Sequence, residues 1–227
     1  MLATRLFDPK GRKEYINWLR VRSPEDFSKN HFRHPLYYSA MLGLVDVTEW
    51  ILTTGVDVNA YLGGRYGNAL QVACRYGQED LVRLLLQKEA NVNASGGRFG
   101  SALQAASANG NEEIVRLLLG AGAAVNGPGL KYGTALQAAC SIGSVPVVRL
   151  LLEHGAEVNT QGGYYGTALQ ASLAFENEEL VTLLLNKGAD VNQNGGAYGG
   201  SLEAATHWDH EAVRQLLLKH GAIVNVM

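Results

Sequence analysis

The histidines, cysteines and acidic residues of this chain are the side chains whose types and spacing could support catalysis or metal binding. His207 and His210 lie three residues apart, so they would share one turn of a helix. No third ligand has a spacing that completes a metal site with them, and solvated side chains are the simpler interpretation. Neither cysteine stands in register with a histidine that could activate it as a nucleophile. The chain also has no Gly-x-x-x-x-Gly-Lys-Ser/Thr phosphate loop. We therefore expect no catalytic residue, no bound metal and no cofactor.

An internal repeat sets the elements that must position every side chain. The six-residue motif Tyr-Gly-Thr-Ala-Leu-Gln at 165–170 has four relatives at intervals of 33 residues, which begin at Tyr66, Phe99, Tyr132 and Tyr198. A fixed period of that length is the sequence signature of a stacked repeat protein. Such a protein has no central pocket, so its binding surface must be sought among the residues that vary between copies.

Each copy predicts two short helices followed by a glycine-rich loop. After the hexamer, a stretch of small residues runs to a glycine, as at 105–110. An acidic helix start and an apolar run follow, as at 111–119. The unit closes on a Gly-Gly pair, or on Gly127-Pro128-Gly129 in one copy, which is typical of a chain reversal. Helices of about nine residues do not persist alone in water, so neighbouring copies must cover their apolar faces.

This unit resembles the ankyrin repeat, whose usual length is about 33 residues with a Thr-Pro-Leu-His core. The equivalent positions read Thr-Ala-Leu-Gln at 134–137 and at 167–170, and only the first copy, His-Pro-Leu-Tyr at 34–37, keeps the proline. Glutamine in the histidine position, with Gly-Gly-x-Tyr-Gly in the loop, is similar to the ankyrin arrays common in fungal proteins. In that group such arrays often follow a NACHT-type nucleotide-binding domain in large receptor-like chains.

The resemblance covers residues 32–227 and implies an all-α solenoid of helix-turn-helix units with β-hairpin-like loops. The expected repeats are 32–65, 66–98, 99–131, 132–164, 165–197 and 198–227. Residues 1–31 fall outside the period, and 14–20 within them have the pattern of an amphipathic helix. We expect residues 1–31 to form a helical cap on the first repeat or, alternatively, a linker from a preceding domain.

Composition and charge limit the classes of partner. The net charge of the 227-residue chain is −2, which argues against nucleic acid as the main partner. No apolar run approaches the roughly 18 residues of a membrane span, and the N-terminus has no secretory hydrophobic region. Cys74 and Cys140 occupy one position two repeats apart, beyond disulfide reach, so we expect them to be buried packing residues. We expect a cytoplasmic or nuclear monomer, or part of a larger chain.

Charged residues also recur with the period, on the second helix of the unit. Acidic pairs at the start of that helix, as at Glu112-Glu113, would be stabilised by the helix dipole. Arginines recur on the same helix at Arg83, Arg116 and Arg149. We expect these arginines to form ion pairs between neighbouring repeats on the outer face, which is a structural role.

Residues that differ between copies at equivalent positions are the candidates for partner binding. One set ends the first helix of the unit and comprises Arg75, Tyr76, Asn109, Ile142, Phe175, His207 and Trp208. A second set stands at the loop tips before the hexamers and comprises Arg65, Arg98, Lys131 and Tyr164. The large apolar members of the first set either pack under the neighbouring repeat or form an exposed strip that anchors a partner.

The charge of the candidate surface changes along the array. The first three loop tips are basic, whereas residues 132–227 carry four Lys or Arg against nine Asp or Glu, a local charge of 4 − 9 = −5. Such a gradient would orient a partner more than it would raise affinity. The aromatic residues that open each hexamer keep their character between copies, so we expect them to stack between loops and not to recognise a partner.

The sequence thus predicts a non-catalytic scaffold that binds a protein partner along a concave surface. One alternative is a ligand-sensing array that belongs to a larger NACHT-type receptor-like protein. A second alternative is an enzyme that uses the concave groove as its active site, where a bound metabolite would contact Arg75, Glu203 or His207.

Overall fold

The computed structural model describes residues 34–62, 67–127, 129 and 132–224. The expected N-terminal cap at 1–31 and the binding candidates Arg65 and Lys131 lie outside these residues. The described helices form six pairs: α2 (Pro35–Leu42) with α3 (Val45–Thr53), α4 (Ala69–Tyr76) with α5 (Glu79–Gln87), α6 (Ala102–Ser107) with α7 (Glu112–Gly120), α8 (Ala135–Cys140) with α9 (Val145–Glu153), α10 (Ala168–Ser172) with α11 (Glu178–Asn186), and α12 (Ser201–His207) with α13 (Glu211–Lys219).

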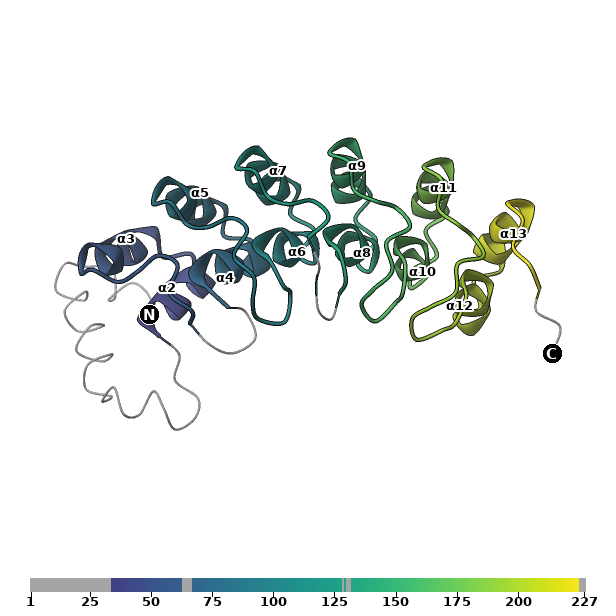
Figure 1. Cartoon of the computed structure of the whole chain (residues 1–227), viewed down its shortest axis with the longest axis horizontal. Coiled ribbons are helices and arrows are strands. Elements are labelled where there is room, and N and C mark those ends of the chain that lie inside the picture. The colour runs from purple at the N-terminus through teal and green to yellow at the C-terminus, as the bar shows by residue number, and fades with distance from the viewer. Residues whose placement is uncertain (1–33, 63–66, 128, 130–131, 225–227) are drawn as a thin grey trace, which may run out of the picture.

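The pairs stack side by side into two rows (Figure 1). The even-numbered helices form an inner row, and the odd-numbered helices form an outer row on the convex side of a gentle arc. The loops that join one pair to the next project from the inner row and bear isolated antiparallel bridges, such as Gly162 with Gly166. The fold is therefore the predicted all-α solenoid with hairpin-like loops.

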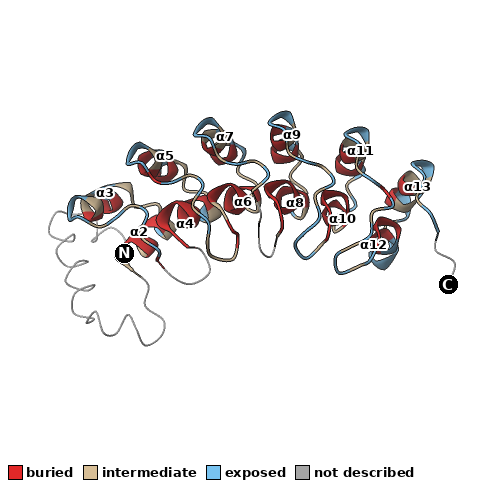
Figure 2. Ribbon diagram, viewed as in Figure 1, coloured by how far each residue is buried: buried red, intermediate tan, exposed pale blue. Residues whose placement is uncertain are grey.

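The core lies between the two rows and continues along the stack (Figure 2). The outer helix α7 buries Ile114, Val115 and Leu118 on one face, while all six residues of the inner helix α6 are buried. The inner helices consist largely of alanine and other small residues, which allow neighbouring backbones to approach closely. Because each helix is so short, its burial depends on the repeats on either side.

Capping residues define where the inner helices begin. Thr134 accepts a hydrogen bond from the backbone N–H of Gln137, while the Gln137 side chain accepts one from the backbone N–H of Thr134 at 2.7 Å. This reciprocal capping box recurs at the N-termini of α4 and α10. At the other end, glycine in the left-handed conformation closes α2 and α4, with φ of 69° at Gly43 and 71° at Gly77.

In the second to fifth repeats, two side-chain amides bind backbone atoms, and each of them reaches the next repeat. The Gln137 amide donates to the carbonyl oxygens of Thr160 at 2.7 Å and Gly166 at 2.9 Å. Equivalent bonds are formed by Gln71, Gln104 and Gln170. Asn159 donates to the carbonyl oxygen of Gly188 at 2.9 Å and accepts from the N–H of Asp190 at 2.8 Å. Equivalent bonds are formed by Asn93, Asn126 and Asn192. We call these two sets the glutamine ladder and the asparagine ladder.

Candidate functional site

Large side chains at the ends of the inner helices remain partly in solvent. The exposed fractions of Tyr76, Ile142, Phe175 and Trp208 lie between 37% and 46%. Two of these side chains also contact the preceding repeat: the Phe175 ring lies 3.6 Å from where a Cβ on Gly143 would stand, and Ile142 Cδ1 lies 3.0 Å from the equivalent point on Gly110. Ile142 and Phe175 thus pack partly on a neighbouring turn and are partly exposed to solvent, so both interpretations drawn from the sequence apply to them.

The N-terminal part of this surface includes a guanidinium that lies over an aromatic ring. The Arg75 guanidinium is 5.5 Å from the ring centroid of Phe99, and it donates a hydrogen bond to the Asn109 side-chain oxygen at 3.4 Å. Phe99 stacks on Tyr132 with centroids 5.2 Å apart and ring planes at 4°. Arg98, a candidate at the preceding loop tip, is half-buried. The Arg75 guanidinium of the second repeat is therefore already bound by Phe99 and Asn109 of the third repeat.

The C-terminal part of the surface is aromatic. Tyr164 contacts Tyr165 and Tyr198 edge to face, with ring centroids 5.1 and 6.4 Å apart. Tyr198 also contacts His207 at 4.8 Å and Trp208 at 6.0 Å. We call these five residues the aromatic cluster. It joins a loop-tip candidate, Tyr164, to two helix-end candidates, His207 and Trp208.

Partial burial affects the titration of the cluster phenols. Burial raises the pKa of Tyr198 above its ordinary value, and the neighbouring Tyr164 hydroxyl raises it further. Burial, followed by the charges of the adjacent tyrosines, also raises the pKa of Tyr165. Both phenols therefore stay neutral at physiological pH, which leaves their rings available for contacts with cations or apolar groups.

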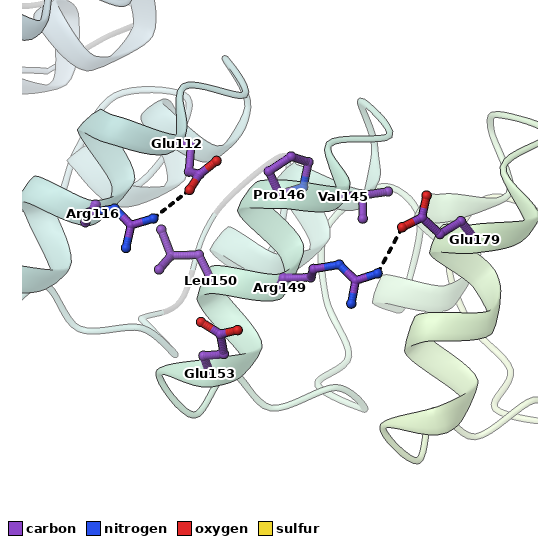
Figure 3. Close-up of a pocket in the computed structure, with 8 residues that line it drawn as sticks. All are labelled: Glu112, Arg116, Val145, Pro146, Arg149, Leu150, Glu153 and Glu179. Atoms are coloured by element: carbon purple, nitrogen blue, oxygen red, sulfur yellow. Dashed lines mark hydrogen bonds and ion pairs between the residues drawn. The ribbon is translucent and has the colours of Figure 1, made fainter.

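The outer row carries a cleft of about 540 Å³ between α7 and α9 (Figure 3). On this row, Arg83 bridges to Glu113 of the next repeat at 2.8 Å, and Arg149, which lines the cleft, bridges to Glu179 of the next repeat at 2.9 Å. Arg116 was expected to bridge in the same way, but it pairs with Glu112 of its own helix at 2.6 Å. Pro146 occupies the position in α9 where the other two helices carry the accepting glutamate, so the expected bridge is missing and the cleft stays open.

Comparison with known proteins identifies the repeat. A family model described as ankyrin repeats in three copies matches residues 96–162, and one described as ankyrin repeats in many copies matches residues 70–119. Residues 70–162 thus match ankyrin repeats, and the helix pairs before and after them stack in the same way. Among solved structures, the human ASB11 ankyrin repeat domain has a TM-score of 0.72 and 25% identity, and the match covers 86% of each chain. Among curated proteins, no relative matches the sequence.

The ankyrin array does not bring together the residues that an active site in the groove would need. Arg75 lies on α4, whereas Glu203 and His207 lie on α12, four helix pairs farther along the stack. Within the described ranges, no three His, Cys, Asp or Glu side chains are placed to hold a metal ion. Both cysteines are fully buried free thiols, and burial raises the pKa of each. Across the described part of the chain, no helix is long and apolar enough to span a membrane.

Two structural roles in these ankyrin repeats were missed from the sequence. Tyr198 was assigned to loop stacking because its character does not vary, and its contact with the loop-tip residue Tyr164 agrees with that; its contact with Trp208 was not foreseen. The glutamine of the hexamer was recognised as a substitution for histidine, but its bonds to the next repeat were not foreseen. A polar residue repeated among alanine and leucine could have indicated those bonds, because buried polar groups are nearly always hydrogen-bonded.

Proposed function

We propose that this ankyrin array is a non-catalytic module that binds a protein partner along its inner row and loops. The observation that carries the proposal is the set of large, partly exposed side chains that recurs from repeat to repeat on one side of the stack: Tyr76, Ile142, Tyr164, Phe175 and Trp208. Aromatic side chains of this kind dominate the binding energy of protein interfaces.

The bonding between repeats supports the same function. The glutamine and asparagine ladders fix each repeat to the next through backbone atoms. A surface built on such a frame is already ordered before a partner arrives, so less conformational entropy is lost on binding. The charge gradient, with Arg98 among the basic tips and an acidic C-terminal half, would orient the partner along the array.

In the alternative function, the array is the sensor of a receptor. A ligand would bind the same surface, but its binding would send a signal to an attached domain. This alternative would make the six repeats the sensor of a NACHT-type protein of the fungal kind, and the full-length transcript would test it.

The two buried free thiols suit a reducing compartment, so we place the module in the cytoplasm or nucleus.

The proposal is tested by affinity capture from a cell extract with three forms of the array. The Tyr76→Ala/Trp208→Ala variant should lose proteins that the wild type captures, because each truncation at a binding hot spot costs about 2 kcal/mol or more. An outer-row control, Glu153→Ala/Lys187→Ala, should retain them. Thermal unfolding should change little, since both aromatic side chains are partly in solvent. Equal capture by all three forms would overturn the proposal, and a large fall in the melting temperature of the first variant would show that these residues are core.

A further inference from the structure

The array contains its own example of a guanidinium lying over a ring of the inner surface. Arg75 reaches the Phe99 ring, which opens the hexamer 24 residues later. The residue 24 positions before Tyr198 is Ala174, whose side chain is too short to reach that ring. No arginine therefore stands at the equivalent position before Tyr198, and among the described residues that ring contacts Tyr164, His207 and Trp208.

The rings of the aromatic cluster are arranged to receive such a group. Tyr164 and Trp208 both contact Tyr198, with interplanar angles of 90° and 62°, so the three rings face different directions. Tyr164 is 51% exposed and Trp208 is 40% exposed. Aromatic faces attract cations, tryptophan most strongly, and arginine is the cation most often found over them. Its planar guanidinium also stacks on a ring while it pairs with a carboxylate.

The charges around the aromatic cluster favour a cation as well. Four lysines and arginines lie between residues 132 and 224, a range that is fully described, and all are on outer-row helices or their ends: Arg149, Lys187, Arg214 and Lys219. The inner row has exposed carboxylates instead: Glu203 on α12, Asp209 directly after Trp208, and Glu176 directly after Phe175. Opposite charges on partners steer encounter and fix the register of binding.

We propose that the aromatic cluster binds an arginine side chain of a basic segment in the protein partner. The guanidinium lies over the exposed rings of Tyr164 and Trp208. Asp209, directly after Trp208, balances its charge together with the more distant Glu203, whose carboxylate lies beside Gly200 at the start of α12. This proposal rests on the proposed function, and it names the partner chemistry at the C-terminal half of the surface. The partner segment carries arginine at the end that meets α12.

The test measures binding of a fluorescein-labelled hexa-arginine peptide to the array by fluorescence polarisation at low ionic strength. Trp208→Leu should weaken binding roughly three- to thirty-fold, the range expected for loss of a cation–π contact. Glu203→Gln/Asp209→Asn should also weaken it severalfold. This second variant is well suited to fold normally, because glutamine is the residue that four other repeats carry at that position. Asparagine, in turn, tolerates the positive φ of 56° at position 209.

A matched control removes the same two charges from the outer row, as Glu153→Gln/Glu179→Gln. It should bind the peptide as the wild type does, and a labelled hexa-glutamate peptide should not bind through the cluster. Three results would overturn the proposal: an unchanged affinity in Trp208→Leu, equal losses in the inner and outer charge variants, or hexa-glutamate binding that depends on Trp208.

The outcomes separate this proposal from the proposed function. If cluster variants lose captured proteins yet bind hexa-arginine normally, the module binds proteins but the cluster does not bind arginine. If hexa-arginine binding depends on the cluster while capture is unaffected by Tyr76→Ala/Trp208→Ala, the arginine site stands and the proposed function fails.

Discussion

Gln137 and Gly166 are joined by a hydrogen bond of 2.9 Å from the side-chain amide in one repeat to a backbone carbonyl oxygen in the next. The same amide group also caps the helix to which it belongs. One buried side chain thus determines where a helix begins and where the following loop docks. The repeated hexamer is conserved between copies for this bonding, and its glutamine is a structural residue of the stack.

The Gln137→Glu variant should be less stable by about 1–3 kcal/mol, because a buried carboxylate would face two carbonyl oxygens that now accept hydrogen bonds. Burial would raise the pKa of the new carboxyl group in the folded state above its unfolded value. The protonated form then favours folding, so the deficit should shrink as the pH falls through the raised pKa and grow as the pH rises. Urea denaturation across pH measures both effects. The same change at exposed Gln87 should alter stability by less than about 0.5 kcal/mol, and equal effects at both positions would contradict the role of Gln137.

The missing bridge on the outer row should be restorable by Pro146→Glu. A glutamate there would occupy the position from which Glu113 and Glu179 accept arginines of the preceding repeat. Because the pair would be largely solvent-exposed, a double-mutant cycle with Arg116→Gln should give a coupling energy of only about 0.2–1 kcal/mol, smaller at high salt. Pro146→Gln supplies the uncharged control cycle. A coupling of zero at low salt would mean that Arg116 keeps its contact with Glu112 and does not cross the cleft.

The buried thiols of Cys74 and Cys140 should make stability fall at alkaline pH. Burial holds both pKa values above the ordinary 9.0, so the unfolded state ionises first as the pH rises. Each thiol stabilises the fold fully below its unfolded pKa and loses that contribution above it, by about 1.4 kcal/mol per pH unit. Chemical denaturation between about pH 8 and 10 measures the slope. The Cys74→Ala/Cys140→Ala variant should show a flatter profile, and a profile identical to that of the wild type would refute this explanation.

Much of the architecture could be predicted from the sequence because the period alone indicates stacking, short helices and loops. The period is less informative about contacts between copies. It predicted a bridge from Arg116, and a single proline in the next repeat removed the acceptor. It placed Tyr198 among scaffold residues, whereas contact with Tyr164 and Trp208 places that ring within the candidate surface. A comparison of the repeats shows which positions keep their residue type and which vary. It does not show which of the unvarying residues a variable residue contacts.

The asparagine ladder has a consequence for how such a chain can change length. Asn159 binds the carbonyl of Gly188 and the N–H of Asp190, and Asn126 binds the corresponding atoms of Gly155 and Glu157. Because the four junctions from Asn93 to Asn192 use the same backbone atoms at the same interval, one complete repeat among them can be duplicated or lost and each remaining asparagine still finds its partners. Recombination can therefore change the distance between the basic and the aromatic halves of the surface by whole repeats. Each new junction would use the hydrogen bonds that the existing junctions use.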